Sequence, residues 1–84
     1  MNKIASTQSH AVLSELFILH TDIQTRTAFT RVRRTLMKIP GVFRCTIDLD
    51  DCDRVLRVEC NGRTIDDIIR EVRELGFHCR ELEG

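Results

Sequence analysis

The stretch "IPGVFRCTIDLDDCDRVLRVEC", residues 39–60, decides the fold. Pro40 and Gly41 end whatever helix precedes them, because proline cannot continue a helix and glycine takes up the left-handed stop. Residues 42–49 then alternate between apolar and polar side chains, the run "DDCD" is a polar turn, and residues 54–60 alternate again. Alternation on both sides of a short polar turn predicts a β-hairpin.

Helical periods flank this hairpin on both sides. Before it, apolar residues recur every three or four positions from Phe29 to Ile39, and after it they recur from Ile65 to Leu75. Thr64 and Asp67 have the spacing of a capping box, which marks the start of the second helix. Two further strands are predicted, at residues 12–19 ("VLSELFIL") and at residues 77–82 ("FHCREL").

The predicted order of elements is therefore βαββαβ. Short connections and right-handed crossovers leave one compact arrangement, an α+β ferredoxin-like sandwich in which a four-stranded antiparallel sheet carries both helices on one face. Residues 1–11 are polar and unpatterned, so they are predicted to be a flexible leader, and residues 12–84 to be a single domain. This plan brings the first strand-to-helix turn, the "DLDDCD" hairpin turn and the "GFH" turn to the same end of the molecule.

Composition narrows the class of protein. The 84 residues carry thirteen basic and thirteen acidic side chains, so the net charge is zero and nothing attracts the whole molecule to nucleic acid or to an anionic membrane. The apolar run "ELFILH" is too short to span a bilayer, and the first residues lack the apolar core of a secretory signal. A cytoplasmic location, with the four cysteines reduced, is the expectation.

The segment from residue 31 to residue 82 resembles a known family. A helix that ends in "IPGV", a "TIDL" strand, a hairpin into "VLRV" and an isoleucine-rich helix that closes with "LGF" are similar to the heavy-metal-associated (HMA) domain of copper chaperones and metal-pumping ATPases. The resemblance extends over roughly residues 15–82. It implies the same ferredoxin-like fold.

The metal-binding motif of that family is absent. Its G-M-x-C-x-x-C loop precedes the first helix and holds copper(I) or another soft ion between two thiolates, which suit a soft cation. The resemblance places the methionine on Ile23, the first cysteine on Thr25 and the second on Ala28. This degenerate loop keeps an apolar anchor and loses both ligands, so no cofactor is expected there.

Relocated ligands could restore a copper or zinc site. Four residues are predicted at the end that holds the three turns, and imidazole with thiolate suits either metal: His20, Asp22, Cys52 and His78. Their spacing is not diagnostic, because none of the cysteines forms a C-x-x-C pair. Plain structural alternatives are an inward-pointing His20 that is hydrogen-bonded to backbone, and an Asp22 that is favoured near a helix N-terminus by its charge alone.

Two surfaces are candidates for binding a protein partner or a second copy. The first is the basic first helix, which has no acidic residue among its cations Arg26, Arg31, Arg33, Arg34 and Lys38. The second is the sheet face away from the helices, where three apolar residues are predicted to be exposed: Phe17, Leu19 and Val55. Pairing through the second or fourth strand is a further possibility. Binding of RNA is not expected, since the third strand lacks aromatic residues on which bases could stack.

No arrangement of residues points to catalysis. No cysteine lies at a predicted helix start, where its thiolate would be stabilised, and "GVFR" at residues 41–44 follows a helix rather than opening one, unlike a phosphate-binding loop. The leading hypothesis is a non-catalytic HMA-like interaction or regulatory module. The alternative is a metal carrier with non-standard ligands.

Overall fold

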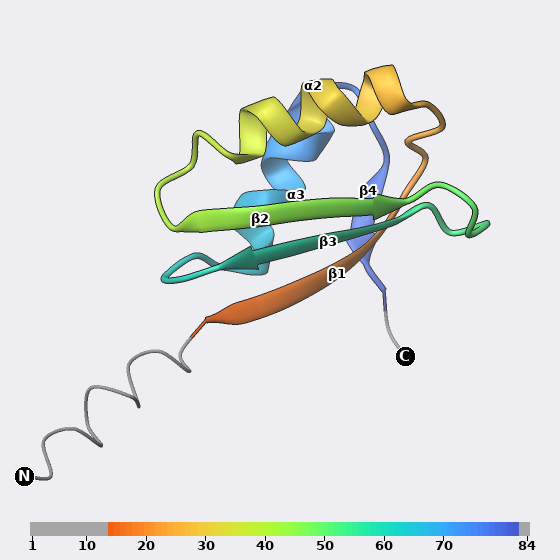
Figure 1. Cartoon of the computed structure of the whole chain (residues 1–84). Coiled ribbons are helices and arrows are strands. Elements are labelled where there is room, and N and C mark those ends of the chain that lie inside the picture. Colours follow the sequence, from red (N-terminus) through yellow and green to blue (C-terminus); the bar gives the residue numbers. More distant parts are fainter. Residues whose placement is uncertain (1–13, 83–84) are drawn as a thin grey trace, which may run out of the picture.

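The structure, a computed structural model, describes residues 14–82. In chain order the elements are β1 (Glu15–Thr21), α2 (Arg26–Leu36), β2 (Val42–Asp48), β3 (Val55–Cys60), α3 (Ile65–Glu74) and β4 (Cys79–Glu81) (Figure 1). The order is the predicted βαββαβ. The first strand lies later than expected and the last is shorter, and the predicted leader at residues 1–11 lies outside the described residues.

The four strands form one antiparallel sheet in the order β2-β3-β1-β4, and both helices cover the same face of it (Figure 1). In the register of the two central strands, Leu19 lies opposite Leu56 and Phe17 opposite Val58. This arrangement confirms the ferredoxin-like sandwich. We call the sheet face away from the helices the open face.

The helices begin where threonine side chains cap them. The hydroxyl of Thr25 accepts a hydrogen bond from the backbone N–H of Ala28, and that of Thr64 accepts one from Asp67. At Thr64 the carboxylate of Asp67 also accepts the Thr64 backbone N–H, which confirms the predicted capping box. Its hydrogen bonds with Arg70 and the Thr64 backbone lower the pKa of the Asp67 carboxyl.

The core lies between the helices and the sheet. Helix α2 contributes Phe29, Val32 and Leu36 to it, as the helical period predicts, and α3 contributes Ile68 and Val72. Strand residues complete it: Leu19, Val42, Cys45, Leu56, Val58, Cys60 and Cys79. Three of the four cysteines are thus small core residues.

The predicted faces of β1 are reversed. Leu19 is fully buried on the helix side and Phe17 packs against the core, whereas Leu16 is 52% exposed on the open face. Alternation could not choose between the faces, because β1 is a central strand with apolar residues on both sides. Val55 has the open-face register as predicted but is only 3% exposed. Phe17, Leu19 and Val55 therefore do not form the predicted exposed apolar surface: the first two face the helices, and the third is buried.

Strand β2 contains a β-bulge at its start. Val42 lies opposite Cys60, but Arg44 lies opposite Glu59, so Phe43 is an extra residue and its side chain is 48% exposed. Next to the bulge, the backbone N–H of Asn61 donates to the carbonyl of Gly41 at 2.8 Å. Gly41 has φ of +98°, and a Cβ at this position would overlap the Asn61 carbonyl oxygen.

Neither α2 nor α3 is long and apolar enough to cross a membrane, and the rest of the described chain holds no such helix either.

Candidate functional site

Three turns meet at one end of the sheet, as the topology predicts. The hairpin joins the end of β1 through the backbone N–H of Thr21, which donates to the Asp53 carbonyl at 3.1 Å. The Thr21 hydroxyl donates to the Arg54 carbonyl at 2.7 Å. The turn before β4 joins the same end, because the backbone N–H of His78 donates to the Asp22 carboxylate at 2.9 Å. This end of the molecule is the candidate site.

The β1–α2 turn is stabilised by hydrogen bonds between its own backbone and its threonine side chains. Ile23 is fully buried, and its backbone N–H donates to the Thr21 hydroxyl at 3.2 Å. Thr25 uses its hydroxyl to cap α2 at Ala28, whose methyl group cannot coordinate anything. These residues do not fit a soft cation, which prefers thiolate ligands. The turn therefore serves as a helix start.

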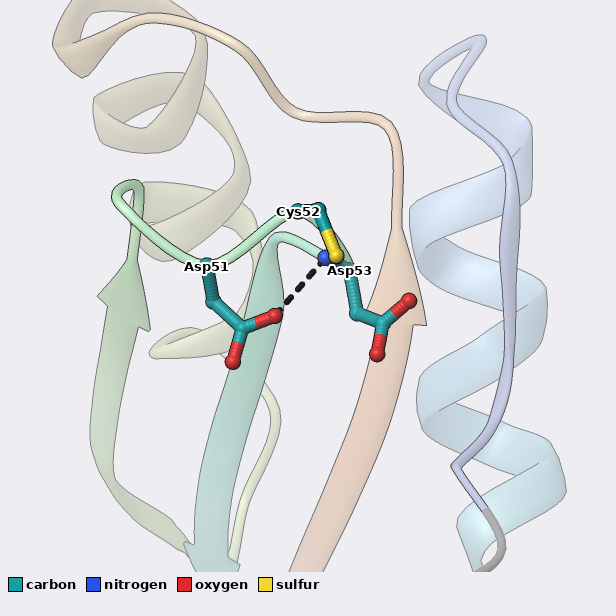
Figure 2. Close-up of side chains that lie close together, drawn as sticks. All are labelled: Asp51, Cys52 and Asp53. Atoms are coloured by element: carbon teal, nitrogen blue, oxygen red, sulfur yellow. Dashed lines mark hydrogen bonds between the residues drawn. The ribbon is translucent and has the colours of Figure 1, made fainter.

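The β2–β3 hairpin carries the groups best suited to a metal. Figure 2 shows Asp51, Cys52 and Asp53 in the turn, and the possible ligand atoms of the three side chains lie within 4.8 Å of one another. The backbone N–H of Asp53 donates to the Asp51 carboxylate at 2.8 Å, a hydrogen bond that tightens the turn. Cys52 is exposed. Two carboxylates beside an accessible thiol make a mixed oxygen and sulfur ligand set.

His20 lies beside this cluster. Its Nδ1 is 3.2 Å from a carboxylate oxygen of Asp53, although the geometry is not that of a hydrogen bond. This nitrogen is buried and has no hydrogen-bond partner within residues 14–82. The prediction that His20 points inward is wrong: its ring lies on the open face and about a quarter of the side chain is exposed.

The four predicted ligands divide into two pairs. His20 and Cys52 both lie at the hairpin, next to Asp53. Asp22 and His78 instead lie at the turn before β4, joined by the hydrogen bond from the His78 backbone, in a shallow cavity shared with Arg73 and Phe77. Asp51 and Asp53 were not predicted as ligands. The feature that could have indicated them is the antiparallel pairing of β1 with β3. With Leu19 opposite Leu56, the turn before β3 lies next to the end of β1, and Asp53 lies beside His20.

The buried thiols are not candidate ligands or nucleophiles. Burial raises the pKa of Cys45 to about 12 and that of Cys79 to about 11, and it also raises the pKa of Cys60. A thiol reacts and binds metals as the thiolate, which these positions disfavour. Cys52 is the exposed cysteine of the chain.

The other candidate site is the outer side of α2, which we call the basic face. It consists of the exposed residues Arg26, Arg31, Arg33, Arg34 and Lys38. Within residues 14–82 the ion pairs are His20–Asp53, Arg44–Glu59 and Arg70–Asp67, so none of them involves the basic face. Two of its cations lie over aromatic rings, Arg26 over Phe29 and Arg31 over Phe77, each at 5.7 Å from the ring centroid.

Comparisons with known proteins bear on the fold. No family model matches the sequence, and no curated protein is similar enough to match. Among solved structures, one described as "CsoZ metallochaperone" superposes with a TM-score of 0.71 at 16% sequence identity. The match covers 80% of this chain and 97% of that one. At this identity the similarity shows a shared fold.

Proposed function

We propose that this chain is a non-catalytic HMA-like interaction module whose basic face binds an acidic protein partner. The observation that carries the proposal is the concentration of five exposed cations on and just after α2. The helix contains no acidic residue, and within residues 14–82 no ion pair involves any of the five cations. The neighbouring helix, α3, has a mixed surface instead, with acidic and basic residues interspersed.

Unpaired positive charge favours encounter with an acidic surface. Such charge raises the rate of association and excludes basic partners by repulsion. Contacts with the rings of Phe29 and Phe77 restrict the guanidinium groups of Arg26 and Arg31 before a partner arrives, which lowers the entropy lost on binding. These features support docking at α2.

The β1–α2 turn supports the same proposal. Its potential ligand positions hold a helix cap at Thr25 and a methyl group at Ala28, so the fold is kept without the thiolate pair. The buried thiols, with raised pKa values, offer no nucleophile. A domain of this kind can present a rigid helix to a partner while performing no chemistry itself.

Affinity capture with the full chain under reducing conditions tests this function. The double variant Arg33→Glu/Arg34→Glu is compared with Arg57→Glu/Arg80→Glu, a matched change on the open face. We expect a specific partner that is captured by the wild type and by the open-face variant. The basic-face variant should bind the purified partner at least about tenfold more weakly, and added salt should weaken the wild-type complex. Loss of the partner only in the open-face variant would contradict the proposal.

A second candidate function is metal carriage at the hairpin. It is favoured by the proximity of Cys52 to Asp51 and Asp53, and by the 3.2 Å contact of His20 with Asp53. Zinc accepts sulfur, nitrogen and oxygen ligands, and copper(I) prefers the sulfur. Asp22 and His78 are not members of this ligand set, because they lie together at the other turn.

Titration of the reduced protein with zinc or copper(I), followed by amide chemical shifts, separates the two functions. The carrier function predicts one-to-one binding at micromolar affinity or tighter, with shifts concentrated at residues 50–54 and lost in Cys52→Ser. The interaction module predicts weak shifts without a single saturable site. Tight binding that survives Cys52→Ser would contradict the hairpin ligand set.

A further inference from the structure

Strand β2 forms one border of the sheet, and within residues 14–82 only β3 pairs with it (Figure 1). A strand at a border presents unpaired backbone N–H and C=O groups, which can pair with a further strand. Strand β2 is seven residues long, whereas β4, at the other border of the described sheet, is three residues long. The longer border is the better template for strand pairing.

The regular part of β2 has one centre. After the bulge at Phe43, residues Arg44 to Asp48 pair one-for-one with β3, and Thr46 is the middle residue of these five. A second copy that pairs antiparallel about a two-fold axis at Thr46 would therefore use the whole regular segment. An axis at Cys45 would instead draw the bulge into the pairing.

The side chains of this segment are complementary to themselves in that register. Arg44 of one copy lies opposite Asp48 of the other, and the symmetry produces this pair twice. Both residues lie on the open face, since their partners on β3 are Glu59 and Val55. Arg44 is 66% exposed, and its contact with Glu59 is long, at 3.6 Å, so the guanidinium can reach a second carboxylate.

The core face of the same register is apolar. Cys45 of one copy lies opposite Ile47 of the other, and Ile47 is only half-buried in the single chain. Opposite charges and apolar groups across a strand pair both stabilise it. Pairing of the two β2 strands brings the two cationic α2 helices nearer to each other, and their repulsion opposes the association. The dimer is therefore expected to be weak.

We propose that β2 pairs antiparallel with β2 of a second copy about an axis at Thr46, with Arg44 opposite Asp48 on each side of the axis. The resulting dimer has a continuous eight-stranded sheet. It leaves the outer surfaces of the hairpin turn and of α3 free. The pairing uses β2 rather than the basic face, so this proposal does not rest on the acidic partner proposed above.

Sedimentation of the full reduced chain at increasing concentration, up to about 0.5 mM, tests the proposal. We expect a monomer–dimer equilibrium in the wild type. Arg44→Asp or Asp48→Arg alone should weaken it about tenfold or more, because each places like charges opposite each other twice. The exchange Arg44→Asp/Asp48→Arg should restore it. Arg80→Asp, a matched charge change on β4, should leave it unchanged.

A mixture of the two single variants provides a test that does not depend on the exchange variant. Arg44→Asp in one chain and Asp48→Arg in the other are complementary in this register, so the mixture should form a heterodimer although each variant alone is monomeric. A wild type that stays monomeric throughout would overturn the proposal. So would a dimer that persists equally in both single variants, since it would use another surface.

Discussion

The two helices lie side by side on one face of the same sheet, yet they are stabilised differently. Helix α3 begins with a reciprocal capping box, has Asp66 and Asp67 in its first turn, and carries an ion pair between Asp67 and Arg70. Helix α2 begins with a single cap at Thr25 and has no acidic residue in its first turn. Negative charge at a helix N-terminus is favourable, and α2 lacks it.

The comparison teaches which interactions each helix depends on. Local interactions stabilise α3 in addition to its buried residues, whereas α2 depends on burial of Phe29, Val32 and Leu36. The cations of α2 repel one another, and none forms an ion pair along the helix, although Arg26 lies over the ring of Phe29. Arg33 and Arg34 lie in the last turn, where positive charge is favourable, but the remaining cations of the basic face have no such role within the helix.

The largest expected effect comes from removing one buried side chain under each helix. Leu36→Ala in α2 and Ile68→Ala in α3 should each lower the free energy of unfolding by about 2–5 kcal/mol, because both side chains are fully buried. Chemical denaturation measures the loss. Amide exchange should then show faster local opening of α2 in the first variant than of α3 in the second. Equal opening of both helices would remove the distinction between them.

An intermediate effect on stability is expected from two buried thiols, one near each helix. Cys45 lies near Arg33 of α2, and Cys79 lies near Arg73 of α3. Burial raises their pKa values to about 12 and about 11, from an ordinary value of 9.0. The folded state therefore keeps protons that the unfolded state releases, so stability should fall as pH rises above about 9. Each thiol contributes a slope of up to about 1.4 kcal/mol per pH unit.

Unfolding measured at several alkaline pH values tests this dependence, and the chain contains no tyrosine to confuse it. Cys45→Ala and Cys79→Ala should each make the decline less steep, and the effect of Cys45→Ala should continue to higher pH. A decline of unchanged steepness in both variants would show that these thiols do not titrate in this way.

The smallest expected effect comes from giving α2 the acidic residue that it lacks. Thr30 is exposed, four residues after Arg26 and four before Arg34. Thr30→Glu should stabilise the protein relative to Thr30→Gln by about 0.2–0.5 kcal/mol for each ion pair formed, and salt should reduce the difference. Thermal unfolding at low and high salt measures it. If Glu and Gln behave alike, the cations of α2 are not free to pair.

The fold followed from patterns that act over short distances. The stop at Pro40 and Gly41, the hairpin around "DDCD" and the capping box at Thr64 depend on residues close together in the chain, so the sequence predicts them directly. These patterns also determined the topology, because short connections between such elements leave few alternatives.

The candidate site was harder to predict, for two physical reasons. A central strand with apolar residues on both faces gives no sign of which face is covered, so alternation alone assigns Leu19 to the wrong face of β1. The proximity of His20 to Asp53 depends on the register between β1 and β3, which joins residues far apart in the chain. Hence only part of the ligand cluster was expected.

The extra residue at Phe43 has a consequence for insertions and deletions in this chain. In a regular strand, side chains on the same face are separated by an even number of positions. Because of the extra residue, Val42 and Cys45 both face the core although they are three positions apart. Loss of one residue here would return the strand to uninterrupted alternation without inverting anything beyond it. The same loss between Thr46 and Asp48 would move the remaining side chains of the strand to the other face, so within β2 a one-residue deletion should be tolerated only at the bulge.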